Sequence, residues 1–156
     1  MDARLRFVDE HLRPVAASVE ATWQAVDDLM TAPPAGPGAR YARLVGARDG
    51  RPFEVAESVP PHRLVLVGEH RFARYSLVLT VDELGSGLTA LRVQTWAAFP
   101  GALGRLYRAA VIDSRGHVLI VRWLLGRIAR RAERGADRPP AAGTRTPTCH
   151  QHRHSS

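Results

Sequence analysis

Residues 100–133 carry the clearest single pattern in this 156-residue chain. The stretch has no proline after its first residue, and apolar side chains recur in it every three or four positions, which is the spacing of one helix face. The pattern predicts a long C-terminal helix of about 50 Å, at 1.5 Å per residue. That face comprises Leu103, Tyr107, Ala110, Ser114, His117, Val121, Leu124 and Ile128. Ser114 and His117 interrupt it with polar groups, and these interruptions are the first indication of function.

A strand and a shorter helix are predicted near the N-terminus. Residues 4–12 alternate loosely between polar and apolar side chains and predict a first strand that Pro14 ends. Ser18 can cap a helix through its hydroxyl. That helix is expected to run to about Met30, before a proline-rich loop, and one of its faces consists of Val19, Trp23, Val26 and Met30.

Short segments rich in β-formers fill the middle of the chain, separated by turn residues. The Asp49-Gly50 dipeptide is the strongest hairpin signal among these turns. Connections of hairpin length predict an antiparallel meander. The predicted strands cover residues 41–47, 53–59, 63–72, 75–84 and 88–99, which gives six with the first. The order of elements predicts an α+β domain over residues 1–134. Residues 135–156 lack apolar periodicity and predict a disordered tail.

The net charge of +7 comes mostly from the predicted C-terminal helix and the tail. Every basic residue is arginine, which is typical of a GC-rich bacterial genome, and residues 1–99 are nearly neutral. Phosphate backbones are bound by cations clustered over a broad face, so we expect no nucleic-acid partner. The lone Cys149 permits no internal disulfide, and the sequence has neither a signal peptide nor an apolar run long enough to cross a membrane. A soluble cytoplasmic protein is therefore expected.

The segment Ala16–Leu29 resembles a phrase of the START-like, or SRPBCC, superfamily. Members commonly have a tryptophan followed three residues later by a valine or leucine after the first strand, and Trp23 and Val26 occupy those positions. A narrower resemblance is to an uncharacterised subgroup, in which the last strand ends in Ala-Phe-x-Gly and leads into a Gly-x-Leu-Tyr helix with one histidine. The corresponding residues are Ala98-Phe99, Gly101, Gly104 to Tyr107, and His117.

The resemblance implies the helix-grip fold, in which a curved antiparallel sheet of six to seven strands grips a long C-terminal helix. It also implies a cavity for a small hydrophobic molecule that is lipid- or polyketide-like. Some members catalyse cyclisation, dehydration or hydrolysis in that cavity, so the resemblance leaves open whether this chain is an enzyme.

His117 is the leading candidate for chemistry, because it lies on the helix face that should meet the sheet. It is a candidate general acid or base, with Tyr75 polarising a ligand oxygen. Strand alternation places His70 and Tyr75 on one side of the sheet, where both would reach the same cavity. Thr95, Tyr107 and Ser114 would each add a hydroxyl to its wall. The alternative is structural: His117 is satisfied by a carbonyl or by Ser114, His70 lies on the surface at a strand end, Tyr75 is an ordinary core residue, and Thr95 is simply a good strand former.

Arginines on the opposite face of the predicted helix offer a second interpretation. Arg105, Arg108, Arg115 and Arg122 alternate there with Ile112 and Leu119. That face is either a solvated surface or a contact for an anionic membrane or an acidic partner, and its apolar residues would also suit a homodimer contact. No spacing fits a metal site, and we expect no metal or other cofactor. The leading hypothesis is therefore binding of a small hydrophobic ligand, and the alternative is a non-catalytic interaction module that uses this arginine face.

Overall fold

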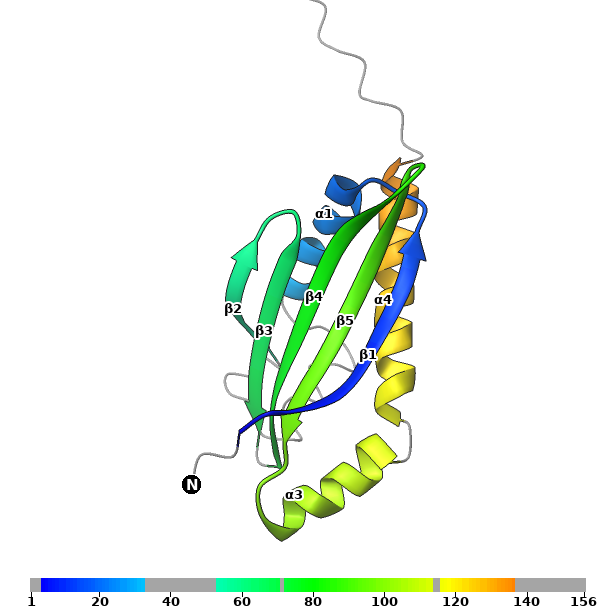
Figure 1. Ribbon diagram of the computed structural model, residues 1–156. Helices are drawn as coiled ribbons and strands as arrows, with labels where there is room; N and C mark the ends of the chain where they lie inside the picture. The colour runs from blue at the N-terminus through cyan, green and yellow to red at the C-terminus, as the bar shows by residue number, and fades with distance from the viewer. Residues whose placement is uncertain (1–3, 33–52, 71, 114–115, 137–156) are drawn as a thin grey trace, which may run out of the picture.

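A computed structural model describes residues 4–32, 53–70, 72–113 and 116–136. Five antiparallel strands form one sheet in the order β1-β5-β4-β3-β2 (Figure 1). The strands are β1 (Arg6–Val15), β2 (Glu54–Val59), β3 (Arg63–His70), β4 (Ala73–Gly85) and β5 (Leu88–Ala98). The first strand thus pairs with the last, a helix follows β1, and β2 to β5 pair in sequence order as antiparallel neighbours. The predicted strand 41–47 lies outside the described residues, so the described part of the chain has five strands where six to seven were expected.

Strand β1 continues through Pro14 to Val15, where the sequence predicted an end at the proline. β1 lies at the edge of the sheet. Proline lacks an N–H group and is tolerated in edge strands because one side of such a strand makes no ladder hydrogen bonds. The strand can therefore include Pro14 and end at Val15.

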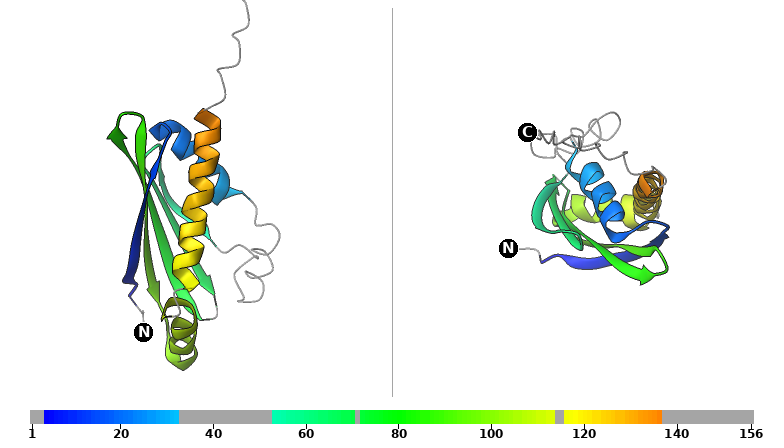
Figure 2. Two further views of the ribbon diagram at one scale, coloured as in Figure 1. Left: turned by 90° about the vertical axis from the view of Figure 1, so that its right-hand side faces the viewer. Right: turned by 90° about the horizontal axis from the view of Figure 1, so that it is seen from above.

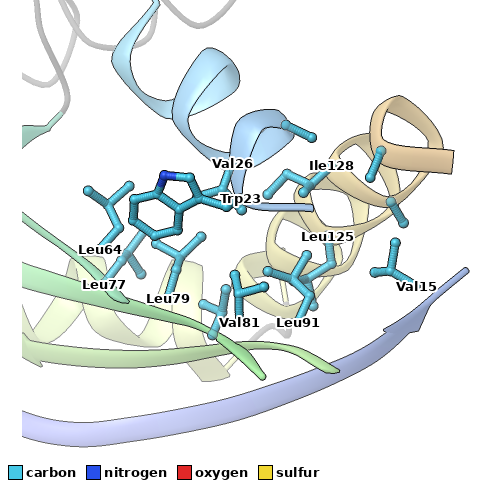
Figure 3. Close-up of a cluster of buried hydrophobic side chains, with 14 of the residues drawn as sticks. Val15, Trp23, Val26, Leu64, Leu77, Leu79, Val81, Leu91, Leu125 and Ile128 are labelled. Atoms are coloured by element: carbon cyan, nitrogen blue, oxygen red, sulfur yellow. The ribbon is translucent and has the colours of Figure 1, made fainter. Parts of the chain in front are cut away.

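The two longer helices cover the same face of the sheet (Figure 2). Helix α1 (Val19–Thr31) begins as predicted, with the Ser18 hydroxyl accepting a hydrogen bond from the Ala21 backbone N–H at 3.2 Å. Helix α4 (Gly116–Ala136) lies beside it. A buried apolar cluster fills the space between these helices and the sheet (Figure 3). It includes Trp23 and Val26 of α1, Leu79 and Leu91 of the sheet, and Ile128 of α4.

The predicted single helix over residues 100–133 is wrong. Helix α3 (Gly101–Arg108) is followed by the π-helical segment η2 (Ala109–Asp113), and α4 begins at Gly116. Figure 1 shows that α3 crosses the end of the sheet at an angle to α4. The two helices pack on different partners, since α4 lies on the face of the sheet and α3 at its end. A single straight helix cannot make both sets of contacts. The new helix starts at Gly116, and glycine is a poor helix former.

Candidate functional site

Four polar side chains meet on the helix-covered face of the sheet, near the start of α4. His117 Nε2 lies 3.1 Å from Thr95 Oγ1 of β5 and 3.4 Å from Asp9 Oδ1 of β1. The other carboxylate oxygen of Asp9 lies 3.2 Å from His11 Nε2. The side chains of His117 and Asp9 are 17% and 21% exposed, so the cluster is largely withdrawn from solvent yet still reachable. We call Asp9, His11, Thr95 and His117 the polar cluster.

The register of β1 against β5 brings the two strands' contributions together. Asp9 pairs with Thr95, and His11 pairs with Val93, a core residue. Side chains of paired residues point to the same face of a sheet, so Asp9 and His11 point inward with Val93 and Thr95. A register shift between Phe7 and Asp9 sets this phase. The irregularity therefore decides which β1 side chains face His117.

Side-chain contacts on the outward face of β1 stabilise the same register between β1 and β5. Glu10 accepts hydrogen bonds from Gln94 and from Arg92, both on β5. These bonds, that from Gln94 being the larger influence, lower the pKa of the Glu10 carboxyl below its usual value. The anchored Glu10 fixes its neighbour Asp9 on the opposite face.

The polar cluster favours a proton on Nε2 of His117. A carboxylate oxygen can only accept a hydrogen bond, and Asp9 Oδ1 is buried without a hydrogen-bond partner of good geometry. An Nε2–H directed between Asp9 and Thr95 satisfies that oxygen, whereas an unprotonated Nε2 would face it with a lone pair. Within the described residues Nδ1 makes no hydrogen bond.

A partly open pocket of about 490 Å³ lies at the end of the sheet next to the polar cluster. It is lined by Arg4, Arg6, Phe7, Val8, Ala97, Ala98, Phe99, Arg105, Arg108 and Ile112. Ala97 is two residues beyond Thr95 on the same face of β5, and it pairs with Arg6. The pocket thus begins two residues along β5 from Thr95 of the polar cluster. His117 is not among its lining residues. We call it the arginine pocket.

Helix α3 forms one wall of the arginine pocket because it packs closely against the end of the sheet. The ring of Tyr107 stacks on Phe72 with centroids 5.6 Å apart, and it also contacts Phe99 at 6.3 Å. Gly104 is buried, and a Cβ built on it would lie 2.7 Å from the carbonyl carbon of Phe99. Only glycine allows the helix to come so near the strand end. These contacts hold Arg105 and Arg108 beside the pocket.

Of the predicted site residues, the structure places His117 and Thr95 within hydrogen-bonding distance of each other. Tyr75 packs edge-on against Phe53 at 5.3 Å, and Tyr107 belongs to the aromatic contact beneath α3. The backbone of His70 ends β3, paired with Ala73. Ser114 lies outside the described residues. The roles assigned to these residues remain predictions.

Sequence reasoning missed Asp9 and His11. The signal was present, since two hydrogen-bonding side chains stand two positions apart in a predicted strand and must share a face. Without the register, nothing showed that this face points inward. Arg105 and Arg108 are exposed, as the helical pattern predicted, but they also line the arginine pocket. Over the described ranges, no group of three or more His, Cys, Asp or Glu side chains is arranged to hold a metal ion. No helix of that part is long and apolar enough to cross a membrane.

Comparison with solved structures identifies the fold. A norcoclaurine synthase point mutant from Thalictrum flavum, in complex with a transition state analogue, superposes with a TM-score of 0.50 and 10% identity, over 86% of this chain and 98% of that one. A START superfamily protein from Mycobacterium smegmatis gives 0.46 and 16%, over 85% and 98%. The Zhui aromatase/cyclase from Streptomyces sp. R1128 gives 0.44 and 14%, over 84% and 95%. No protein-family model and no curated protein sequence matches the chain. The chain thus shares the overall fold of the norcoclaurine synthase, and at 10% identity this likeness shows the fold alone.

Proposed function

We propose that this helix-grip domain binds a small hydrophobic molecule between the end of the sheet and the helical segment 101–113. The arginine pocket carries the proposal. Its volume of about 490 Å³ falls within the usual range for small-molecule sites, and six of its ten lining residues are apolar. Burial of apolar ligand surface against Phe7, Phe99 and Ile112 would supply the affinity.

The polar cluster would orient or activate the part of the ligand that extends along β5 toward Thr95. Asp9 holds Nε2 of His117, which leaves Nδ1 to give or take a proton. Tyr75 pairs with Ala97, a lining residue of the pocket, and is our candidate for polarising a ligand oxygen. Chemistry of the cyclase, dehydratase or hydrolase type would use these groups, and binding alone would need only the pocket.

A neutral, solvatochromic probe tests the binding proposal without involving charge. We expect Nile red to gain fluorescence on binding, and Ile112→Trp to reduce this gain severalfold because the larger side chain fills the pocket. Leu106→Trp is the matched control, since Leu106 is 68% exposed on α3 and does not line the pocket. Equal binding by wild type and both variants, with unchanged circular dichroism, would reject the pocket as the binding site.

A second candidate function rests on the exposed face of α4. Leu119, Ile120 and Trp123 are 70%, 60% and 57% exposed, an unusual cluster for a solvated helix. The guanidinium of Arg127 lies 5.0 Å from the ring centroid of Trp123, and Arg122 is exposed nearby. Apolar side chains flanked by arginines suit the interface of an anionic bilayer.

Vesicle binding tests this alternative. If it holds, the protein sediments with vesicles of phosphatidylglycerol but not with phosphatidylcholine alone, and Trp123 fluorescence shifts to the blue. Leu119→Gln with Ile120→Gln should abolish that binding. Absence of wild-type binding to anionic vesicles would end the alternative. Sedimentation velocity would show whether the same face instead joins two copies of the chain.

A further inference from the structure

The four arginines of the arginine pocket have no anionic partner among the described residues. Elsewhere in the described residues, Arg63, Arg74, Arg92 and Arg131 each pair with a carboxylate. Over the same ranges the side chains of Arg4, Arg6, Arg105 and Arg108 make no ion pair or hydrogen bond. Within the described ranges, no carboxylate pairs with any of these four arginines, although all four line one pocket.

These arginines come from two parts of the chain. Arg6 is the first residue of β1 and Arg4 precedes it, whereas Arg105 and Arg108 lie on α3, about 100 residues later. Cations in the last turn of a helix stabilise it, which accounts for Arg105 and Arg108 by local structure. Neither Arg4 nor Arg6 is on a helix, so that explanation does not extend to them. The tertiary fold gathers like charges around one pocket, and their mutual repulsion is relieved when an anion binds between them.

The surroundings of these arginines define the rest of the ligand. Phe7, Phe99 and Ile112 line the same pocket, so an anion bound there lies next to apolar surface. A guanidinium presents its donors as a planar fork that matches a carboxylate or phosphate group. We propose that the ligand of this pocket is an anionic amphiphile, with a carboxylate or phosphate held by Arg6, Arg105 and Arg108 and an apolar body against the aromatic wall. The inference rests on the proposed function and specifies its ligand class.

Matched eight-carbon probes separate the charge from the apolar body. Octanoate, octyl phosphate and 1-octanol would each compete with Nile red at low ionic strength. We expect octanoate or octyl phosphate to bind at least about tenfold more tightly than 1-octanol, with the order of the two anions identifying the preferred group. Raising the salt to about 0.5 M should reduce this preference through screening.

Variants assign the preference to the pocket. Arg6→Gln combined with Arg108→Gln should remove most of the difference between octanoate and 1-octanol and leave 1-octanol binding nearly unchanged. Arg13→Gln is the control, because Arg13 is an exposed arginine of the same strand that does not line the pocket. Equal binding of octanoate and 1-octanol by wild type would overturn the inference while sustaining the proposed function. A preference that survives in the double variant would also overturn it, and failure of all three probes would reject both proposals.

Discussion

His117 Nε2 and Thr95 Oγ1, 3.1 Å apart, join the first turn of α4 to the middle of β5. Farther along α4, contact with the sheet is made by apolar residues such as Val121 and Leu125. The side chains between α4 and the sheet are therefore polar near the start of α4, beside the arginine pocket, and apolar farther along the helix. Binding of the proposed ligand needs only the arginine pocket, whereas any chemistry on it would use the polar cluster.

Thr95→Val should destabilise the protein by about 1–2 kcal/mol, because it removes the hydroxyl partner of a mostly buried histidine. Urea unfolding measures the loss. Thr80→Val is the matched control, since Thr80 lies on the neighbouring strand β4 and makes no side-chain hydrogen bond within the described residues. We expect the control to change stability by less than about 0.5 kcal/mol. Equal effects of the two substitutions would show that the His117–Thr95 contact contributes nothing.

Two buried helical glycines should respond to alanine with opposite signs. At Gly104 the new Cβ would meet the backbone of Phe99 at 2.7 Å, so Gly104→Ala should cost about 1–3 kcal/mol and displace α3. At Gly126 the nearest atom is the flexible end of Arg130, 3.3 Å away. Gly126→Ala should therefore raise stability, by up to about 1 kcal/mol, through helix propensity. Thermal unfolding of both variants checks the signs, and a harmless Gly104→Ala would refute the close approach of α3.

Two buried threonines provide a similar contrast. The Thr22 hydroxyl is fully buried on α1 and has no hydrogen-bond partner among the described residues. Replacing it in Thr22→Val should stabilise the protein by about 1 kcal/mol. The Thr89 hydroxyl instead donates to the Ala17 carbonyl at 2.7 Å, so Thr89→Val should cost about 1–3 kcal/mol. Chemical unfolding curves compare the two, and destabilisation by Thr22→Val would contradict the assignment of an unsatisfied hydroxyl at this position.

The pairing of α1 with α4 should depend on pH through Asp28. Its carboxylate accepts a hydrogen bond from Arg131 Nη2 at 2.7 Å and another from Gln24 at 2.9 Å. The Arg131 bond, followed by the Gln24 bond, lowers the pKa of Asp28 below the ordinary 3.8. A lowered folded-state pKa stabilises the fold at pH values above 3.8, and that contribution is lost as the pH falls through the folded-state pKa.

Asp28→Asn should accordingly lower the urea midpoint at pH 7, and its difference from wild type should disappear toward pH 2. High salt should shrink the difference at pH 7, because the pair is exposed. Asp82→Asn serves as control, since Asp82 is exposed and makes no ion pair over the described ranges. A difference that stays constant from pH 7 to pH 2 would contradict the assignment.

Local chemistry within the sequence was sufficient to predict several elements. The Ser18 hydroxyl and the apolar spacing that includes Trp23 and Val26 specified α1, and alternation with turn residues specified β2 to β5. These signals act between residues a few positions apart, so they can be read without the fold. The resemblance around Trp23 then implied an antiparallel sheet covered by a C-terminal helix, which the structure has.

Only the tertiary structure decided the site. The periodicity of residues 100–133 continues through α3 and α4, so it did not reveal that the two helices pack on different parts of the sheet and require different axes. The register shift after Phe7 determines that Asp9 faces His117, and it depends on pairing with a strand more than 80 residues away. Arg6 and Arg108 likewise meet around one pocket only through long-range packing. Sequence patterns report which side of an element is apolar, whereas contacts between distant elements depend on register and helix direction, which the whole fold determines.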